Sequence, residues 1–201
     1  METLAIKKRN PKMMLYWKKM FKKELKVHFL TTFIWLIIIT LLKWQWQWNL
    51  IWLWFGAFIG TFLIDIDHLI YLFFTNPHEL TSQRVRRLWE EKHLKELIVL
   101  TFDTSEERMK LAFHNVLFQL ILFVLCFFVL TSTGNLFGVG LVMSMALHLL
   151  KDEFHEWWAG REERLKEWLF WPIKMEVSLQ NQKIFLIFML LLFVALNFFL
   201  I

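Results

Sequence analysis

Cysteine, proline and glycine are scarce in this chain of 201 residues, with one, three and six copies respectively. The single cysteine, Cys126, excludes an intramolecular disulfide, and its apolar neighbours indicate a packing role. The sequence also has no internal repeat, no low-complexity tract, no phosphate-binding glycine loop and no nucleophile elbow. Nothing in it therefore indicates a disulfide scaffold, a P-loop nucleotide enzyme or a serine hydrolase.

Apolar residues, in contrast, are abundant. They make up 57% of the chain, aromatic residues 18%, and the mean hydropathy is +0.45. A water-facing surface cannot cover that composition, so we predict an integral membrane protein, all-α, with one membrane domain spanning residues 1–201. Five apolar segments predict a polytopic bundle of about five spans, several of them shorter than the roughly 20 residues of a full crossing. These segments are 27–42, 50–64 with a continuation through 69–74, 113–130, 136–150 and 184–201.

Lys and Arg alternate between the loops. Nine lie in 7–26, one in the first loop, seven in 84–110, none in 131–135 and five in 151–174. The positive-inside rule then places the N-terminus in the cytoplasm and the C-terminus, after the fifth span, outside. The net charge of +5 reflects this orientation and does not indicate a nucleic-acid partner.

Three segments lie at the cytoplasmic face in this topology. Residues 1–26 form a basic segment whose apolar residues recur at helical spacing, which predicts an interfacial helix on anionic lipid; a solvated charge run is the alternative. Residues 75–112 form a long loop with room for one or two amphipathic helices, and residues 151–183 form an interfacial segment. Membrane lipids are thus expected partners.

Ionisable side chains gather where spans meet the cytoplasm. The run Asp65-Ile66-Asp67-His68 puts two carboxylates and an imidazole into an apolar stretch, and these donors suit Zn²⁺, Mn²⁺ or Fe²⁺. On a continuous helix Asp65 and His68 share a face and Asp67 points away, whereas a break in the helix would let all three converge. The alternative is that they are interfacial charges at a helix end.

A second group lies where the fourth span ends. His148, Asp152 and His155 are spaced i, i+4 and i+7, so one helix face presents two imidazoles and a carboxylate. Glu153 lies beside them as a candidate general base, with a solvated surface role as the alternative. His114 opens the third span on the same predicted side. His28, His78 and His93 are left outside the set of ligands, with His78 or His93 as substitutes if a ligand is missing.

These motifs resemble those of the membrane-bound metal-dependent hydrolase family that includes the LexA-regulated inner-membrane putative hydrolases. That family carries Pro-Asp-x-Asp-His, His-Arg-x-x-Thr-His-Ser and Ser-His-x-x-x-Asp. Its pattern is matched over residues 50–155 by Asp65, Asp67, His68, His114, His148 and Asp152. It is not matched at Ile64, Met109, Asn115 and Leu147, which replace a proline, a histidine and two serines. One family histidine is thus missing, and His155 is a candidate replacement.

The resemblance implies a multi-helix membrane fold in the cytoplasmic membrane of a bacterium or archaeon, with a metal-assisted hydrolytic site. One or two divalent ions, Zn²⁺ first with Mn²⁺ or Fe²⁺ as alternatives, would activate water and polarise an ester or phosphoester. Asp67 or Glu153 would accept the proton of that water. The interfacial position favours an amphiphilic, lipid-like substrate, whose head group Arg84, Arg86 and Arg87 could attract. The expected metal ligands are Asp65, Asp67, His68, His114, His148, Asp152 and His155.

Other functions fit less well. A phosphatidic-acid-phosphatase-type site also uses His-x-x-x-Asp, but the sequence lacks the accompanying Pro-Ser-Gly-His and arginine motifs. A membrane di-iron oxidase needs more paired histidines than seven in total allow. A non-enzymatic metal-binding protein, an ion conduit or a partner subunit is the remaining alternative, although a conduit places its ionisable residues nearer the bilayer midplane.

Overall fold

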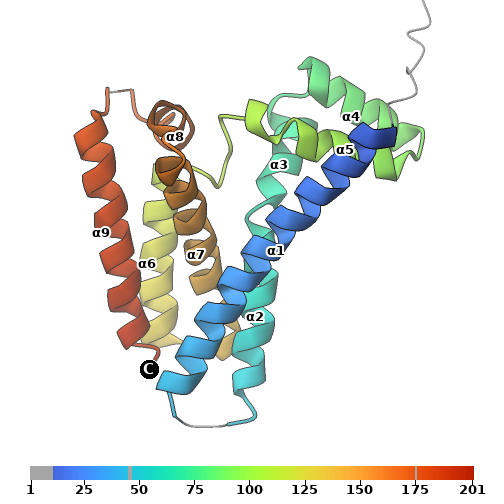
Figure 1. The fold of residues 1–201 in the computed structure, drawn as a ribbon. Coiled ribbons are helices and arrows are strands. Elements are labelled where there is room, and N and C mark those ends of the chain that lie inside the picture. Colours follow the sequence, from blue (N-terminus) through green and yellow to red (C-terminus); the bar gives the residue numbers. More distant parts are fainter. Residues whose placement is uncertain (1–10, 45–46, 175) are drawn as a thin grey trace, which may run out of the picture.

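The computed structural model describes residues 11–44, 47–174 and 176–201, and for residues 11–24 it describes the backbone only. All regular elements in these ranges are helical (Figure 1). They are α1 Pro11–Leu42, α2 Leu50–Leu63, α3 Ile66–Ile70, a π-helical turn Tyr71–Thr75, α4 Leu80–Glu90, α5 Leu94–Asp103, a 3₁₀ turn Ser105–Glu107, α6 Val116–Ser132, α7 Leu136–Trp158, α8 Glu162–Leu169 and α9 Leu179–Phe198.

The long helices run between the same two ends of the molecule. Figure 1 shows α1, α2, α6, α7 and α9 in alternating directions, with α3, α4, α5 and α8 at one end and the C-terminus at the other. We call the end that carries α3, α4, α5 and α8 the site end. The predicted all-helical fold is thus confirmed.

Three helical segments are long and apolar enough to cross a membrane: Leu25–Leu42, Leu50–Thr75 and Leu179–Phe198. At about 1.5 Å per residue the first of them rises about 27 Å, close to the thickness of a hydrocarbon core. α6 is apolar but has only 17 residues, and α7 has 23 residues and includes Lys151, Asp152 and Glu153. The segments Leu25–Leu42, Leu50–Thr75 and Leu179–Phe198 are compatible with an integral membrane protein. The count of five spans and their orientation stay predictions.

Some segment boundaries differ from those expected. α7 continues past Leu150 to Trp158, so the predicted interfacial segment 151–183 begins as part of that helix. α6 begins at Val116, so residues 113–115 of the predicted segment 113–130 lie before the helix. The backbone from Pro11 is continuous with the apolar part of α1, and the predicted apolar stripe of residues 1–26 falls largely on side chains outside the described ones.

Glycines bring α2 and α7 into close contact. A β-carbon at Gly56 would overlap the backbone carbonyl of Phe137, one at Gly60 would overlap that of Leu141, and one at Gly140 would overlap that of Leu53. Small residues four apart on one helix face let two backbones approach, which is how many membrane helices associate. The close packing of α2 on α7 is the frame on which the polar cluster is built.

The loop 75–112 folds into the helical pair α4 and α5, as its length suggested. Leu97 and Leu100 of α5 are buried with Leu72 and with Val85 of α4. Trp89, Leu94, Leu97 and Ile98 could form one apolar stripe by their spacing, but of these four only Leu97 is buried and the other three are exposed.

Candidate metal centre

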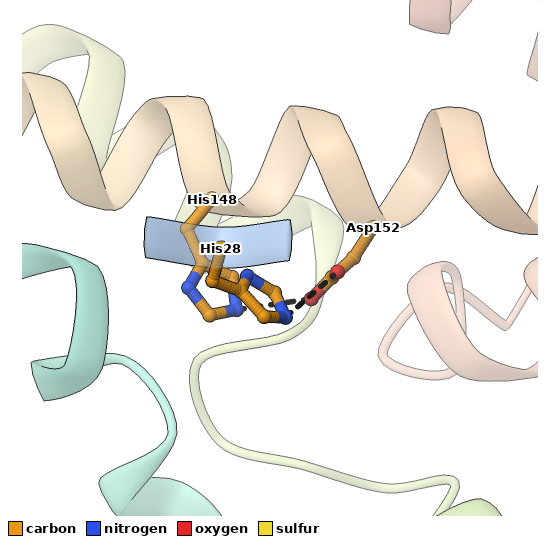
Figure 2. Close-up of side chains that lie close together, drawn as sticks. All are labelled: His28, His148 and Asp152. Atoms are coloured by element: carbon orange, nitrogen blue, oxygen red, sulfur yellow. Dashed lines mark ion pairs between the residues drawn. The ribbon is translucent and has the colours of Figure 1, made fainter. Parts of the chain in front are cut away.

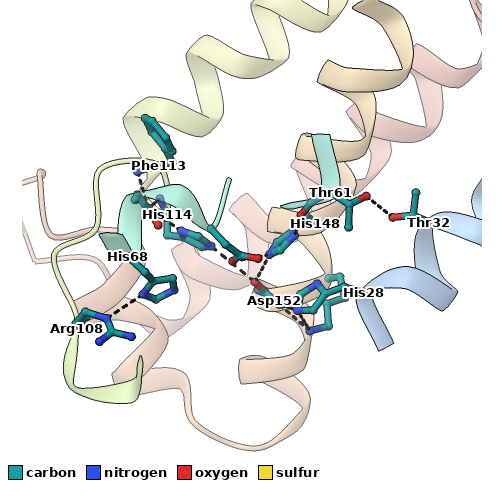
Figure 3. Close-up of polar contacts among 12 residues, drawn as sticks. His28, Thr32, Thr61, His68, Arg108, Phe113, His114, His148 and Asp152 are labelled. Carbon is teal, nitrogen blue, oxygen red and sulfur yellow. Dashed lines mark hydrogen bonds and ion pairs between the residues drawn. The ribbon is translucent and has the colours of Figure 1, made fainter. Parts of the chain in front are cut away.

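Polar side chains from four parts of the chain meet toward the site end, inside the bundle (Figure 3). They come from α1, from the junction of α2 and α3, from the segment before α6, and from α7. The junction carries the break that the sequence left open, because α2 ends at Leu63 and α3 begins at Ile66. The break does not bring all three residues together: Asp65 lies toward His148 of α7, whereas Asp67 reaches the segment before α6, as expected for residues on different faces of a helix.

His148 is the most enclosed member, with a side chain only 1% exposed. Its Nδ1 lies 2.6 Å from the Thr61 carbonyl oxygen of α2, so Nδ1 carries the proton and donates it there. In the neutral ring Nε2 is then the lone-pair atom, and it lies 3.0 Å from Asp152 Oδ2 and 3.5 Å from Asp65 Oδ1. A histidine whose second nitrogen is fixed by a backbone carbonyl has the arrangement common to metal ligands.

Thr61 is itself fixed in place. Its hydroxyl donates to the Ala57 carbonyl oxygen at 2.8 Å and lies 2.7 Å from the Thr32 hydroxyl of α1. The neighbouring Gly60 lies against α7 without a side chain between them. The tautomer of His148 therefore depends on the close packing of α2 against α7.

His114 is oriented by Asp67. The Nδ1 atom of His114 lies 2.8 Å from Asp67 Oδ2, and the same oxygen accepts the backbone N–H groups of Phe113 at 2.9 Å and His114 at 3.2 Å. This carboxylate is fully buried. His114 thus presents Nε2 as its free lone-pair atom, in a carboxylate–histidine arrangement that raises ligand basicity. Asp67 acts on His114 and belongs to neither group of donor atoms that could hold an ion.

Asn115 caps the helix that follows. Its Oδ1 accepts the backbone N–H groups of Leu117 and Phe118, both at 3.1 Å, and its amide donates to the carbonyls of Leu111 and Ala112. Asparagine is among the strongest N-cap residues. The cap holds the segment that carries His114 rigidly before α6.

Three short separations connect donor atoms of the two groups. His114 Nε2 lies 3.8 Å and His148 Nε2 3.0 Å from Asp152 Oδ2, and His148 Nε2 lies 3.5 Å from Asp65 Oδ1. In a tetrahedral Zn²⁺ site with bonds of about 2.0–2.1 Å, neighbouring donor atoms lie about 3.3 Å apart. The observed separations bracket that value, so these residues could hold a divalent ion.

His68 differs from the other two histidines. The Nε–H of Arg108 donates to His68 Nδ1 at 3.0 Å, so the neutral ring carries its own proton on Nε2. Arg108 is buried and also donates to the Thr104 hydroxyl at 3.2 Å and to the Thr101 carbonyl oxygen. Burial lowers the pKa of Arg108 to about 10, which leaves it charged at neutral pH. His68 lies with Asp65 and His114 in a second possible ion-binding group, but in this tautomer its Nε2 is a hydrogen-bond donor.

His28 of α1 is the residue that the sequence reasoning set aside and the structure brings in. Its ring stacks on His148 with centroids 4.1 Å apart, and its Nε2 lies 3.8 Å from Asp152 Oδ1 (Figure 2). His28, His148 and Asp152 form the other group that could hold an ion. The Lys and Arg counts could have indicated His28, because they predict that the start of the first span lies on the same side of the membrane as the other candidate ligands.

Two predicted site residues lie apart from these groups. His155 is exposed and belongs to neither of them, although it shares the face of α7 with Asp152 as its spacing predicted. Glu153 is fully buried and faces Gln119 of α6, because one residue along a helix turns the side chain by about 100° from Asp152. Neither His78 nor His93 replaces a ligand: His93 pairs with Glu96 at 3.4 Å on α5, and His78 belongs to neither group.

No protein-family model matches this chain, and no curated protein and no solved structure matches it. The resemblance to the membrane-bound hydrolases rests on the short motifs alone. The geometry of the donor cluster therefore carries the functional argument.

Proposed function

We propose that this protein is a membrane-embedded metal-dependent hydrolase whose ion is held at the donor cluster of α2–α3, α7 and the segment before α6. The observation that carries the proposal is that three separations, His114–Asp152, His148–Asp152 and His148–Asp65, bracket the distance between neighbouring donor atoms in a tetrahedral ion site. Zn²⁺ suits the two imidazoles best, with Mn²⁺ or Fe²⁺ as alternatives.

The charge of the cluster supports a bound cation. Asp65, Asp67 and Asp152 supply three carboxylates within a largely buried region, against the cationic side chains Lys151 and Arg108. Buried carboxylates are costly unless paired with charge or bound to metal. A divalent ion provides the compensation that the two cationic side chains leave incomplete.

The roles of the side chains follow from exposure and hydrogen bonding. A bound divalent ion would activate a water molecule and polarise the ester or phosphoester oxygen. His114, His148 and Asp152 are the enclosed ligands, and three protein ligands with one exchangeable position are typical of catalytic zinc sites. Asp65, with 43% of its side chain exposed, is the most accessible of the four donors, and its carboxylate would accept the proton of a water molecule activated by a bound ion.

His68 has a complementary role. Because Arg108 donates to its Nδ1, His68 directs an N–H group from Nε2 and can donate to a substrate oxygen that gains negative charge. We therefore assign the general base to Asp65 and not to Asp67 or Glu153, because the side chains of the latter two are fully buried.

The membrane setting suggests the class of substrate. The cluster lies where apolar helices end, and Arg84, Arg86 and Arg87 on α4 are exposed near the same end. An ester or phosphoester of an amphiphilic, lipid-like molecule would place its head group among these charges. The alternating Lys and Arg counts support five spans with the N-terminus and the site on the cytoplasmic side of a bacterial or archaeal cytoplasmic membrane.

Metal analysis combined with turnover tests the proposal. Purified protein in detergent should contain a divalent metal and hydrolyse either bis(4-nitrophenyl) phosphate or 4-nitrophenyl butyrate, with activity lost after chelation and restored by the metal. His148→Ala should abolish both metal binding and turnover, whereas the matched control His155→Ala on the same helix should retain both.

A protein without divalent metal, or one whose turnover is the same after His148→Ala, would contradict the proposal. Metal binding without turnover, together with metal-ion flux across reconstituted vesicles, would support the non-enzymatic conduit instead.

A further inference from the structure

Asp152 faces two positions at once. Its Oδ2 atom points to the nitrogens of His148 and His114, while its Oδ1 atom points to His28 and Lys151. A carboxylate that faces two sets of donors in this way is the bridging group that a two-ion centre requires. The proposed hydrolase needs an ion only at the first set of donors, which leaves the second set without a role.

The second position has donors of the right kind. His28 Nε2 lies 3.8 Å from Asp152 Oδ1, the His28 side chain is 14% exposed, and its ring stacks on His148. His28 reaches this position from α1.

A cation already lies there. The ammonium of Lys151 is 2.8 Å from Asp152 Oδ1 and 3.1 Å from His28 Nε2, so it lies within hydrogen-bonding distance of both donor atoms that a second ion would use. The Lys151 side chain is 13% exposed, and its place next to Asp152 on α7 keeps it close to both partners. An ammonium donates to a carboxylate and to a neutral imidazole with the same charge sign that a metal ion presents.

We propose that Lys151 occupies the second cation position of the centre, so that the protein binds one divalent ion and His28 anchors the lysine rather than a metal. This inference rests on the proposed metal centre and fixes its stoichiometry. The lysine holds Asp152 Oδ1, which leaves Oδ2 directed at the ion between His148 and His114. A second divalent ion would have to displace a like-charged group from between the same two donors.

Metal stoichiometry measures this directly. Full-length protein in detergent, saturated with Zn²⁺ and then freed of unbound metal, should contain one ion per chain by elemental analysis. Lys151→Met, which keeps the length of the side chain and removes its charge, should contain two. Lys151→Met combined with His28→Ala should return to one, and Lys151→Arg should stay at one.

Two control variants test whether a change in the metal count comes from Lys151 and His28 specifically. Lys95→Met removes an exposed lysine of α5 and should leave the count at one. His28→Ala alone should also retain one ion, because His28 is not a ligand of that ion; this variant tests the inference even if Lys151→Met fails to fold.

Two ions in the unmodified protein, one ion in folded Lys151→Met, or loss of the ion in His28→Ala would each overturn the inference while leaving a metal-dependent hydrolase in place. No ion in the unmodified protein would overturn the proposed function together with it.

Discussion

Replacing Asp67 by asparagine tests whether this buried carboxylate orients a ligand or is a ligand itself. The side chain keeps its shape, and an amide oxygen can still accept from His114 Nδ1, now at 2.8 Å from Asp67 Oδ2. The substitution removes the negative charge that makes His114 more basic and places an amide N–H₂ in a buried region. If Asp67 acts only through His114, the ion should remain bound with lower affinity.

The size of the effect follows from this contact. Removal of a carboxylate that supports a ligating histidine typically weakens metal affinity about 10- to 100-fold, or about 1.4–2.8 kcal/mol. Loss of a direct ligand costs far more and prevents stoichiometric binding. Asp67→Asn should therefore keep the same number of ions per chain and raise the Kd for Zn²⁺ by one to two orders of magnitude.

A competition titration against a chromogenic zinc chelator measures both quantities in detergent. Glu90→Gln, which neutralises an exposed carboxylate on α4, is the matched control and should leave the Kd unchanged. An unchanged Kd in Asp67→Asn would refute the orienting role. Complete loss of the ion in a folded Asp67→Asn protein would show that Asp67 is a ligand, as its sequence motif first suggested.

Three further predictions concern packing and the remaining candidates. Gly60→Ala should destabilise the protein by about 1–3 kcal/mol because the new β-carbon would overlap α7, whereas Gly138→Ala, which has no neighbour closer than 3.5 Å, should be neutral or slightly stabilising in thermal unfolding. His155→Ala should leave the Zn²⁺ affinity unchanged, since His155 is exposed and outside both donor groups, and a loss of more than tenfold would restore it as a ligand. Asn115→Ala should lower stability by about 1 kcal/mol through loss of the N-cap, while Asn115→Ser should retain most of it; equal unfolding temperatures for the two would argue against the cap.

The helical fold and part of the site could be predicted from the sequence because they depend on local periodicity. The i, i+4 spacing of His148 and Asp152 requires only that the chain be helical there, and the structure places their side chains 3.0 Å apart. The break before Ile66 was left as one of two alternatives, since a short apolar stretch gives no signal for a kink of one or two residues. Asp65 and Asp67 nevertheless have different partners, as the continuous-helix alternative predicted.

The roles of individual residues were harder to predict because they depend on contacts between distant segments. Asp67 supports His114 because its carboxylate accepts the backbone N–H groups of Phe113 and His114, which lie 46 and 47 residues further along the chain. His28 meets Lys151 across 123 residues, a pairing that no local pattern records. Charge counting limited these residues to one side of the molecule, but it does not tell which of them touch.

The glycines of α2 and α7 connect the fold to the chemistry. Without a side chain at Gly60, the backbone of α2 lies close enough for the Thr61 carbonyl to accept from His148 Nδ1, and this contact decides which nitrogen would face a bound ion. A larger residue at Gly60 would therefore do more than loosen the bundle, because it would also release the tautomer of His148. Stability and metal affinity should fall together for changes on this glycine face, whereas changes at the capping residue Asn115 should reach the ion through His114 alone.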